Sequence, residues 1–139
     1  MMKIYLFLIL MGCSNSRLSE FNDIGNFPKQ EPIVYIPNAG CPGCISYAEE
    51  FLLRNKGSKC VSFILVNVLS QKQLKIKLGQ DILDYENIKI ENGDIFDEYG
   101  VTGFYPFIVY STGDIDEISP ENQQSLSVLE DYLKNNCAL

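Results

Sequence analysis

The chain alternates between short apolar runs and segments in which apolar residues recur every three or four positions. Short apolar runs bounded by turn residues predict buried strands, and the three- to four-residue spacing predicts amphipathic helices. Strands are predicted at residues 33–36, 60–69, 87–91, 107–110 and 115–118. Helices are predicted at residues 41–56, 71–78, 94–99 and from 119 onward.

The order of these elements predicts the fold class. The first strands are separated by helices, as in crossover connections between parallel strands, whereas the two strands around Ser111–Asp114 form a hairpin with Gly113 in its turn. A sheet that contains both kinds of connection is mixed. We therefore predict an α/β fold with a mixed central β-sheet that is flanked by helices on both faces.

Two local patterns near the end of the chain make sharper predictions. Alternation along strand 107–110 predicts that its side chains point to opposite faces of the sheet. One face is expected to carry Phe107 and Val109, and the other Ile108 and Tyr110. The last helix is expected to have Ser119 as its N-cap and Pro120 at its first position.

The N-terminal residues have the pattern of an export signal. Lys3 gives a positive start, and Ile4–Met11 is an apolar run much shorter than the roughly 20 residues that span a bilayer. The run Leu10-Met11-Gly12-Cys13 resembles the lipobox of bacterial lipoproteins, which implies lipid attachment at Cys13. We therefore expect a signal peptide at 1–12, with an ordinary signal peptide and an incidental Cys13 as the alternative.

The expected organisation has three parts and one folded domain. Residues 13–31 are rich in Ser, Asn, Gly and Pro and are predicted to be a tether, and residues 32–139 are long enough for one domain. The lipid at Cys13 would hold this domain, expected to be monomeric, to the outer or inner membrane of a bacterial cell envelope, facing the periplasm.

Charge and composition exclude several classes of function. The chain has 11 Lys and Arg against 18 Asp and Glu, a net charge of −7 that argues against nucleic-acid binding. It contains no His, which excludes Ser-His-Asp hydrolases and His-based zinc or copper sites. The cluster of Asp94, Asp97 and Glu98 is predicted to be a solvated helix face.

A dithiol motif, Cys41-Pro42-Gly43-Cys44, stands at the start of a predicted helix. Backbone N–H groups at a helix N-terminus stabilise an anion, so Cys41 is the expected nucleophile and Cys44 the resolving thiol. Alternatives are a purely structural disulfide or half of a zinc site. A helix over 41–56 spans about 24 Å and places Cys60 at its far end, which disfavours zinc.

Several features together resemble the thioredoxin superfamily, and within it the membrane-anchored thioredoxin-like oxidoreductases of bacterial envelopes. They are the strand 33–36 before the dithiol, the strand 61–68, and the run 99–106 leading into strand 107–110. The resemblance covers roughly residues 32–137. It implies a thioredoxin-like fold in which residues 70–90 form a helix–strand insertion.

The resemblance also implies roles for two further residues. In the family a cis proline lies beside the dithiol, and Pro106 has that position, so the Tyr105–Pro106 peptide is expected to be cis. Tyr105 and Pro106 are then expected to contact the substrate. Three positions depart from the family pattern. The segment from Val101 to Pro106 is one residue longer, Tyr35 replaces a buried aspartate, and Ala39-Gly40 stands before Cys41 where the family has a tryptophan.

The remaining cysteines, Cys60 and Cys137, are placed by the family topology at the pole opposite the dithiol. An oxidising environment favours pairing of exported cysteines, so a structural Cys60–Cys137 disulfide is one interpretation. Two buried free cysteines that act as small hydrophobes are the other.

These expectations converge on a thiol–disulfide oxidoreductase that acts on cysteine-containing envelope proteins through a mixed disulfide at Cys41. The family resemblance favours reduction, which requires an upstream electron donor but no metal or organic cofactor. The main alternative is a redox-inactive lipoprotein that keeps the fold and binds a partner protein. A peroxidase is a weaker alternative, because the Pro/Thr/Cys/Arg pattern that activates peroxide is absent.

Overall fold

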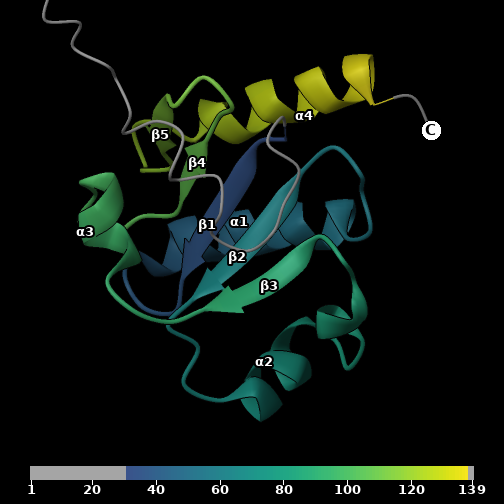
Figure 1. The fold of residues 1–139 in the computed structure, drawn as a ribbon, viewed down its shortest axis with the longest axis vertical. Coiled ribbons are helices and arrows are strands. Elements are labelled where there is room, and N and C mark those ends of the chain that lie inside the picture. Colours follow the sequence, from purple (N-terminus) through teal and green to yellow (C-terminus); the bar gives the residue numbers. More distant parts are fainter. Residues whose placement is uncertain (1–30, 138–139) are drawn as a thin grey trace, which may run out of the picture.

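The computed structural model describes residues 31–137 (Figure 1). The predicted signal peptide 1–12, Cys13 and all of the predicted tether except Glu31 lie outside these residues. The strands are β1 (Ile33–Pro37), β2 (Ser62–Val66), β3 (Ile88–Glu91), β4 (Phe107–Val109) and β5 (Ile115–Glu117). The helices are α1 (Pro42–Asn55), α2 (Gln71–Leu78), the 3-10 helix η2 (Ile82–Asp84), α3 (Ile95–Tyr99) and α4 (Gln124–Asn136).

The five strands form one mixed sheet in the order β3-β2-β1-β4-β5. β1 pairs in parallel with β2, and β2 with β3, whereas β4 is antiparallel to both β1 and β5. The predicted α/β fold with a mixed sheet is confirmed. The carboxyl ends of β1, β2 and β3 meet at one edge of the sheet, at the lower left of Figure 1.

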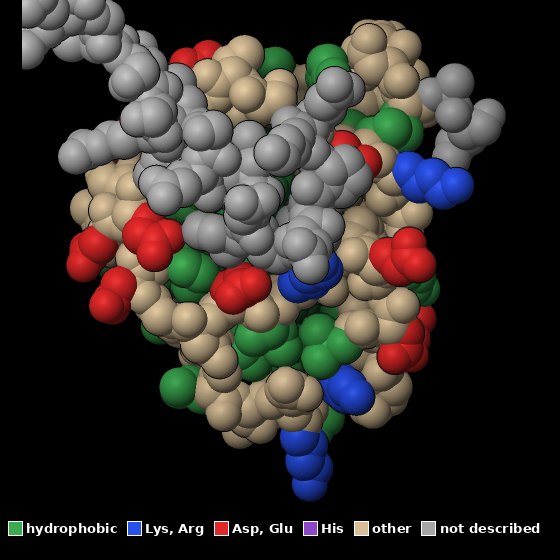
Figure 2. All heavy atoms as spheres, in the orientation of Figure 1, with side chains coloured by type: hydrophobic (Ala, Val, Ile, Leu, Met, Phe, Trp, Pro, Cys, Tyr) green, Lys and Arg blue, Asp and Glu red, His purple; other side chains and the backbone are tan. Residues whose placement is uncertain are grey.

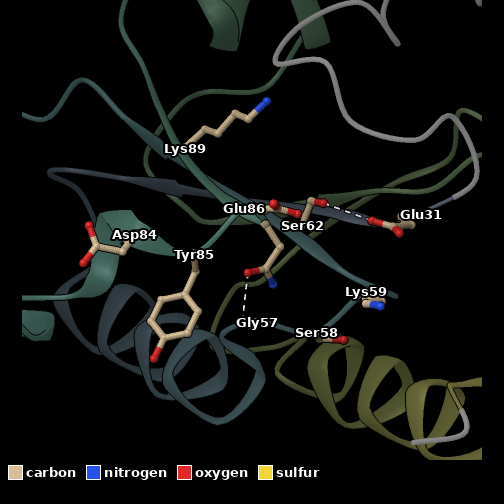
Figure 3. Close-up of a pocket in the computed structure, with 10 residues that line it drawn as sticks. Glu31, Gly57, Ser58, Lys59, Ser62, Asp84, Tyr85, Glu86 and Lys89 are labelled. Carbon is tan, nitrogen blue, oxygen red and sulfur yellow. Dashed lines mark hydrogen bonds between the residues drawn. The ribbon is translucent and has the colours of Figure 1, made fainter.

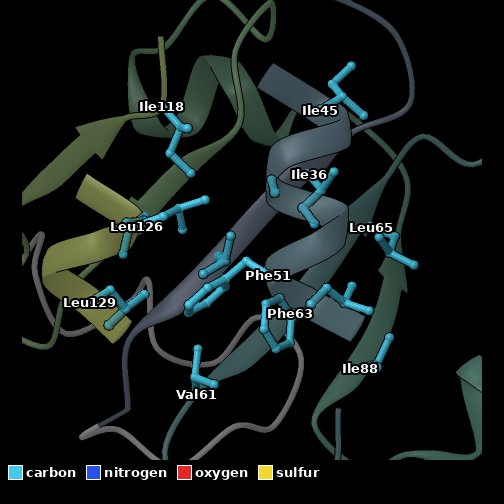
Figure 4. Close-up of a cluster of buried hydrophobic side chains, with 14 of the residues drawn as sticks. Ile36, Ile45, Phe51, Val61, Phe63, Leu65, Ile88, Ile118, Leu126 and Leu129 are labelled. Atoms are coloured by element: carbon cyan, nitrogen blue, oxygen red, sulfur yellow. The ribbon is translucent and has the colours of Figure 1, made fainter. Parts of the chain in front are cut away.

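The larger core lies between one face of the sheet and helices α1, α2 and α4 (Figure 4). The strands contribute mainly Val34, Ile36, Phe63, Leu65, Ile88 and Ile108. The helices contribute mainly Ile45, Ala48, Phe51, Leu52, Leu78, Leu126, Leu129 and Leu133. Burial of each large apolar side chain contributes about 1.5–3 kcal/mol, so this cluster fixes α1 and α4 against the sheet.

The smaller core lies on the opposite face, where α3 packs. Ile33, Tyr35, Ile64, Val66, Ile95 and Phe107 are its buried members. Val109 packs against this cluster and Tyr110 against the larger one, so the predicted alternation along strand 107–110 is confirmed. Asp94, Asp97 and Glu98 are exposed, as expected for a solvated helix face.

β2 and α4 differ most from the prediction in where they begin or end. β2 is shorter than 60–69 because Asn67 adopts a left-handed backbone conformation with a φ of 55°, which ends the strand. α4 does not begin at Ser119: the Asn122 N–H donates to the Ser119 carbonyl at 3.0 Å, so these residues form a turn before the helix. The 3-10 helix η2 was not predicted. Within residues 31–137, no helix is long and apolar enough to cross a membrane.

Candidate active site

Cys41 and Cys44 form a disulfide at the start of α1, with their Cα atoms 5.3 Å apart. The two cysteines differ in exposure. Cys41 is the half-exposed N-cap of the helix, whereas Cys44, in its first turn, is only 1% exposed. A molecule approaching from solvent therefore reaches the sulfur of Cys41 before that of Cys44.

Local sequence explains why the helix begins at this point. Pro42 occupies the first helical position, where its missing N–H costs no hydrogen bond. The Ile45 N–H donates to the Cys41 carbonyl at 2.9 Å, and the Cys44 N–H points at the Cys41 Sγ at 3.3 Å. After reduction, that N–H and the positive end of the helix dipole would stabilise a thiolate at Cys41.

The loop between α3 and β4 holds the dithiol from the other side. The Cys41 N–H donates to the carbonyl of Phe104 at 2.9 Å. Gly40 has a φ of 151°, and a Cβ at this position would run into the Phe104 carbonyl. The close approach of the two backbones therefore requires glycine at position 40. Sequence reasoning did not single out this role of Phe104, whose side chain is 51% exposed.

The expected cis peptide is not present. No peptide bond within residues 31–137 is cis, so the prediction for Tyr105–Pro106 is wrong. The trans form is the usual state of X–Pro bonds, and the carbonyl that the loop directs at the Cys41 N–H is that of Phe104. Tyr105 is half-buried with its ring 5.0 Å from that of Phe104, and Pro106 is buried, with its carbonyl accepting from the Ile118 N–H at 2.7 Å.

Tyr35 is fully buried in the smaller core. Its ring stacks on Phe107 with centroids 4.7 Å apart, and its hydroxyl lies 2.8 Å from the hydroxyl of Tyr99. Burial raises the pKa of Tyr35 well above its usual range, and the bond to Tyr99 adds to this shift. Tyr35 therefore stays neutral and is a packing residue.

A second disulfide joins Cys60 and Cys137, whose Cα atoms are 6.0 Å apart. Cys60 precedes β2 and Cys137 caps α4, so this bond lies at the amino-terminal edge of the parallel strands, opposite the dithiol. It ties the last helix to the sheet. Among residues 31–137, no group of three or more His, Cys, Asp or Glu residues is placed to hold a metal ion.

A broad, open pocket of about 840 Å³ also lies at this opposite edge (Figure 3). Glu31, Lys59, Tyr85 and Lys89 are among the side chains that line it. The Ser62 hydroxyl donates to the Glu31 carboxylate at 3.1 Å, and burial raises the pKa of Glu31. The pocket mixes both signs of charge and lies far from the dithiol in the fold, so it contributes nothing to that chemistry.

The dithiol is thus the part of residues 31–137 with the clearest chemistry. Its two sulfurs are within bonding reach, one accessible and one buried, at the positive end of a 14-residue helix. An accessible sulfur, a second sulfur within bonding reach and a helix N-terminus that stabilises the thiolate all favour thiol–disulfide exchange. No protein-family model, no curated protein and no solved structure matches this chain.

Proposed function

We propose that the protein is a thioredoxin-like thiol–disulfide oxidoreductase with Cys41 as nucleophile and Cys44 as resolving thiol. One observation carries the proposal: a disulfide joins a half-exposed N-cap cysteine to a buried cysteine one turn further along α1. A structural bridge across three residues closes a very small loop and stabilises the fold little. The position of Cys41, partly accessible to solvent at a helix N-terminus, favours exchange chemistry.

The proposed reaction is the reduction of a partner disulfide. The Cys41 thiolate attacks one sulfur of that disulfide, so a mixed disulfide forms and the other partner sulfur leaves as a thiolate. Cys44, after losing its proton to solvent, attacks the Cys41 sulfur, which restores the Cys41–Cys44 bond and releases the second partner sulfur. The partner gains two electrons, and an upstream dithiol donor returns two electrons to Cys41–Cys44 by the same exchange.

The arrangement of elements supports a thioredoxin-like fold. A strand leads into the dithiol helix, a parallel strand follows, and a hairpin and a closing helix complete the domain. Three features differ from the family pattern: the trans peptide in the loop before Pro106, Ala39-Gly40 in place of a tryptophan before Cys41, and the buried Tyr35. These differences favour a second candidate, a redox-inactive lipoprotein that binds a partner protein.

Reduction of insulin by dithiothreitol distinguishes the two candidates. If the first is correct, the wild-type protein accelerates the reaction and Cys41→Ser abolishes the acceleration. Cys44→Ser leaves the nucleophile but removes the resolving thiol, so it should accumulate a mixed disulfide with a partner protein in cells. Equal activity of the wild type and Cys41→Ser, together with no trapped partner for Cys44→Ser, would establish the binding candidate.

We also propose lipid attachment at Cys13 and a place in the bacterial cell envelope. The support is the lipobox pattern before Cys13, which lies outside residues 31–137. The test is fractionation of cells that express the wild type or Cys13→Ser. The wild type should be recovered with membranes, and Cys13→Ser should be released; recovery of both in the same fraction would contradict the proposal.

A further inference from the structure

One surface next to the candidate active site combines exposed apolar side chains with two lysines, of which Lys72 is exposed and Lys75 half-buried. Leu69 is 89% exposed and Ile76 is 68% exposed, although both are large aliphatic residues. Lys72, Lys75 and Ile76 have the i, i+3, i+4 spacing that places them on one face of α2. We call Leu69, Lys72, Lys75 and Ile76 the α2 face.

The charge of the α2 face is opposite to that of the whole chain. The net charge is −7, yet α2 contains three lysines and no acidic residue. Lys77 pairs with the buried Glu49 of α1 at 2.7 Å, but neither Lys72 nor Lys75 forms an ion pair within residues 31–137. In Figure 2, Lys and Arg side chains project over α2, whereas acidic side chains lie on both sides of the view, including the side where α3 lies.

A small pocket lies between Leu69, one member of this face, and the segment that leads to the dithiol. Its volume is about 160 Å³, and its lining includes Pro37 and Asn38 from that segment, and Leu69 and Leu74 from the α2 side. The Asn38 N–H donates to the Val66 carbonyl at 3.1 Å, which holds the segment after β1 beside the end of β2. A protein bound with its sulfur at Cys41 would therefore meet the α2 face first at Leu69.

The exposed Leu69 is held between two anchored residues. On one side, Asn67 is bonded to Gly93 in both directions, with the Gly93 N–H donating to the Asn67 side chain at 2.9 Å. On the other side, Ser70 caps α2 by accepting from the Gln73 N–H at 3.3 Å. The exposed Leu69 side chain contributes no burial free energy to the free protein. Exposed apolar residues rimmed by charge are typical of interaction sites.

We infer that the α2 face docks an acidic, apolar segment of the redox partner and orients its disulfide or thiols toward Cys41. The apolar part of that segment would cover Leu69 and Ile76, and its carboxylates would meet Lys72 and Lys75. The inference rests on the proposed function, because it names the partner class of the same dithiol. Complementary charge of this kind raises association rates more than it raises affinity.

The test compares second-order rates at which the reduced protein reacts with three disulfides. Two are synthetic peptides with one intramolecular disulfide flanked by Leu and by either Glu or Lys, and the third is the small neutral hydroxyethyl disulfide. The protein is the full chain with Cys13→Ser. Lys72→Glu with Lys75→Glu alters the α2 face, and Lys59→Glu with Lys134→Glu is the control, because it changes net charge equally at the opposite edge.

We expect the wild type to reduce the acidic peptide about tenfold faster than the basic peptide at low salt, and less selectively at high salt. Lys72→Glu with Lys75→Glu should abolish that preference, and the control should change it less than about twofold. All three proteins should reduce hydroxyethyl disulfide equally. A similar loss of this preference in both double variants, or no preference in the wild type, would overturn the inference about the α2 face. Neither result would overturn the proposed function.

Two further outcomes have separate meanings. Failure of the wild type to reduce hydroxyethyl disulfide would overturn the proposed function itself. Binding to phosphatidylglycerol vesicles that disappears in Lys72→Glu with Lys75→Glu, with unchanged peptide rates, would assign the α2 face to a membrane surface and overturn docking of a protein.

Discussion

Removal of the Cys60–Cys137 disulfide is expected to be the most destabilising of the changes considered. The change is Cys60→Ala together with Cys137→Ala, and the bond joins residues 77 positions apart. A crosslink stabilises a protein mainly by restricting the unfolded chain, and a loop of this length corresponds to about 4.5 kcal/mol at 25 °C. For a domain of about 100 residues this is a fall in Tm of about 20 °C.

The assay is equilibrium unfolding in urea under non-reducing conditions, with the free energy of unfolding obtained by linear extrapolation. The matched control is Cys41→Ala with Cys44→Ala, which removes two cysteines that are only three positions apart. The same relation assigns that bond about 2 kcal/mol or less. The slope with urea should rise for the Cys60 and Cys137 variant, because its unfolded chain exposes more surface.

A loss below about 2 kcal/mol, or a loss equal to that of the control, would refute the argument from loop length. Peptide mapping without reduction is the necessary companion measurement, because it identifies which cysteines are joined in the wild type. Free thiols at both Cys60 and Cys137 would show that there is no long crosslink to remove.

Three smaller changes test other contacts. Gly40→Ala should lower the free energy of unfolding by more than about 1 kcal/mol, measured in urea, because its Cβ meets the Phe104 carbonyl; unchanged stability would mean that the loop moves freely. Tyr35→Phe removes the hydroxyl pair with Tyr99 and should cost about 1 kcal/mol in the same assay, whereas a gain would contradict the pairing. Burial and Asp116 raise the pKa of Tyr110 to about 12 from 10.0, so the unfolded chain ionises first and stability should fall between these pH values. Tyr110→Phe should lessen that fall when urea midpoints at about pH 9 and about pH 11.5 are compared, and an identical fall in both proteins would disprove it.

Elements fixed by local periodicity could be predicted from the sequence. The predicted helix 71–78 has the observed bounds of α2, because Ser70 caps it and Gly79 ends it. The alternation along strand 107–110 assigned side chains to the correct sheet faces, because successive residues of a strand point to opposite faces. The position of the dithiol at a helix start also follows from neighbouring residues, above all Pro42.

Features that depend on contacts distant in sequence could not be predicted in this way. The Phe104 carbonyl reaches Cys41 across 63 positions, and nothing in the run 99–106 indicates which carbonyl faces the dithiol. The Pro120 signal placed the start of α4 too early, because the turn from Ser119 to Asn122 intervenes. The exposure of Leu69 likewise follows from Asn67 and Gly93, which belong to different loops.

The two disulfides differ in ways that suit different tasks. The Cys41–Cys44 bond constrains a loop of only a few residues. When it is opened, the backbone of Cys41 still forms hydrogen bonds with Phe104 and Ile45. The Cys60–Cys137 bond constrains a loop that covers most of the domain. When it is opened, the end of α4 is no longer joined covalently to Cys60. Because the loop-closure entropy is small for the first bond and large for the second, repeated reduction at Cys41 costs the fold little while Cys60–Cys137 stays closed. A redox cycle at one edge of the sheet is therefore compatible with a permanent crosslink at the other.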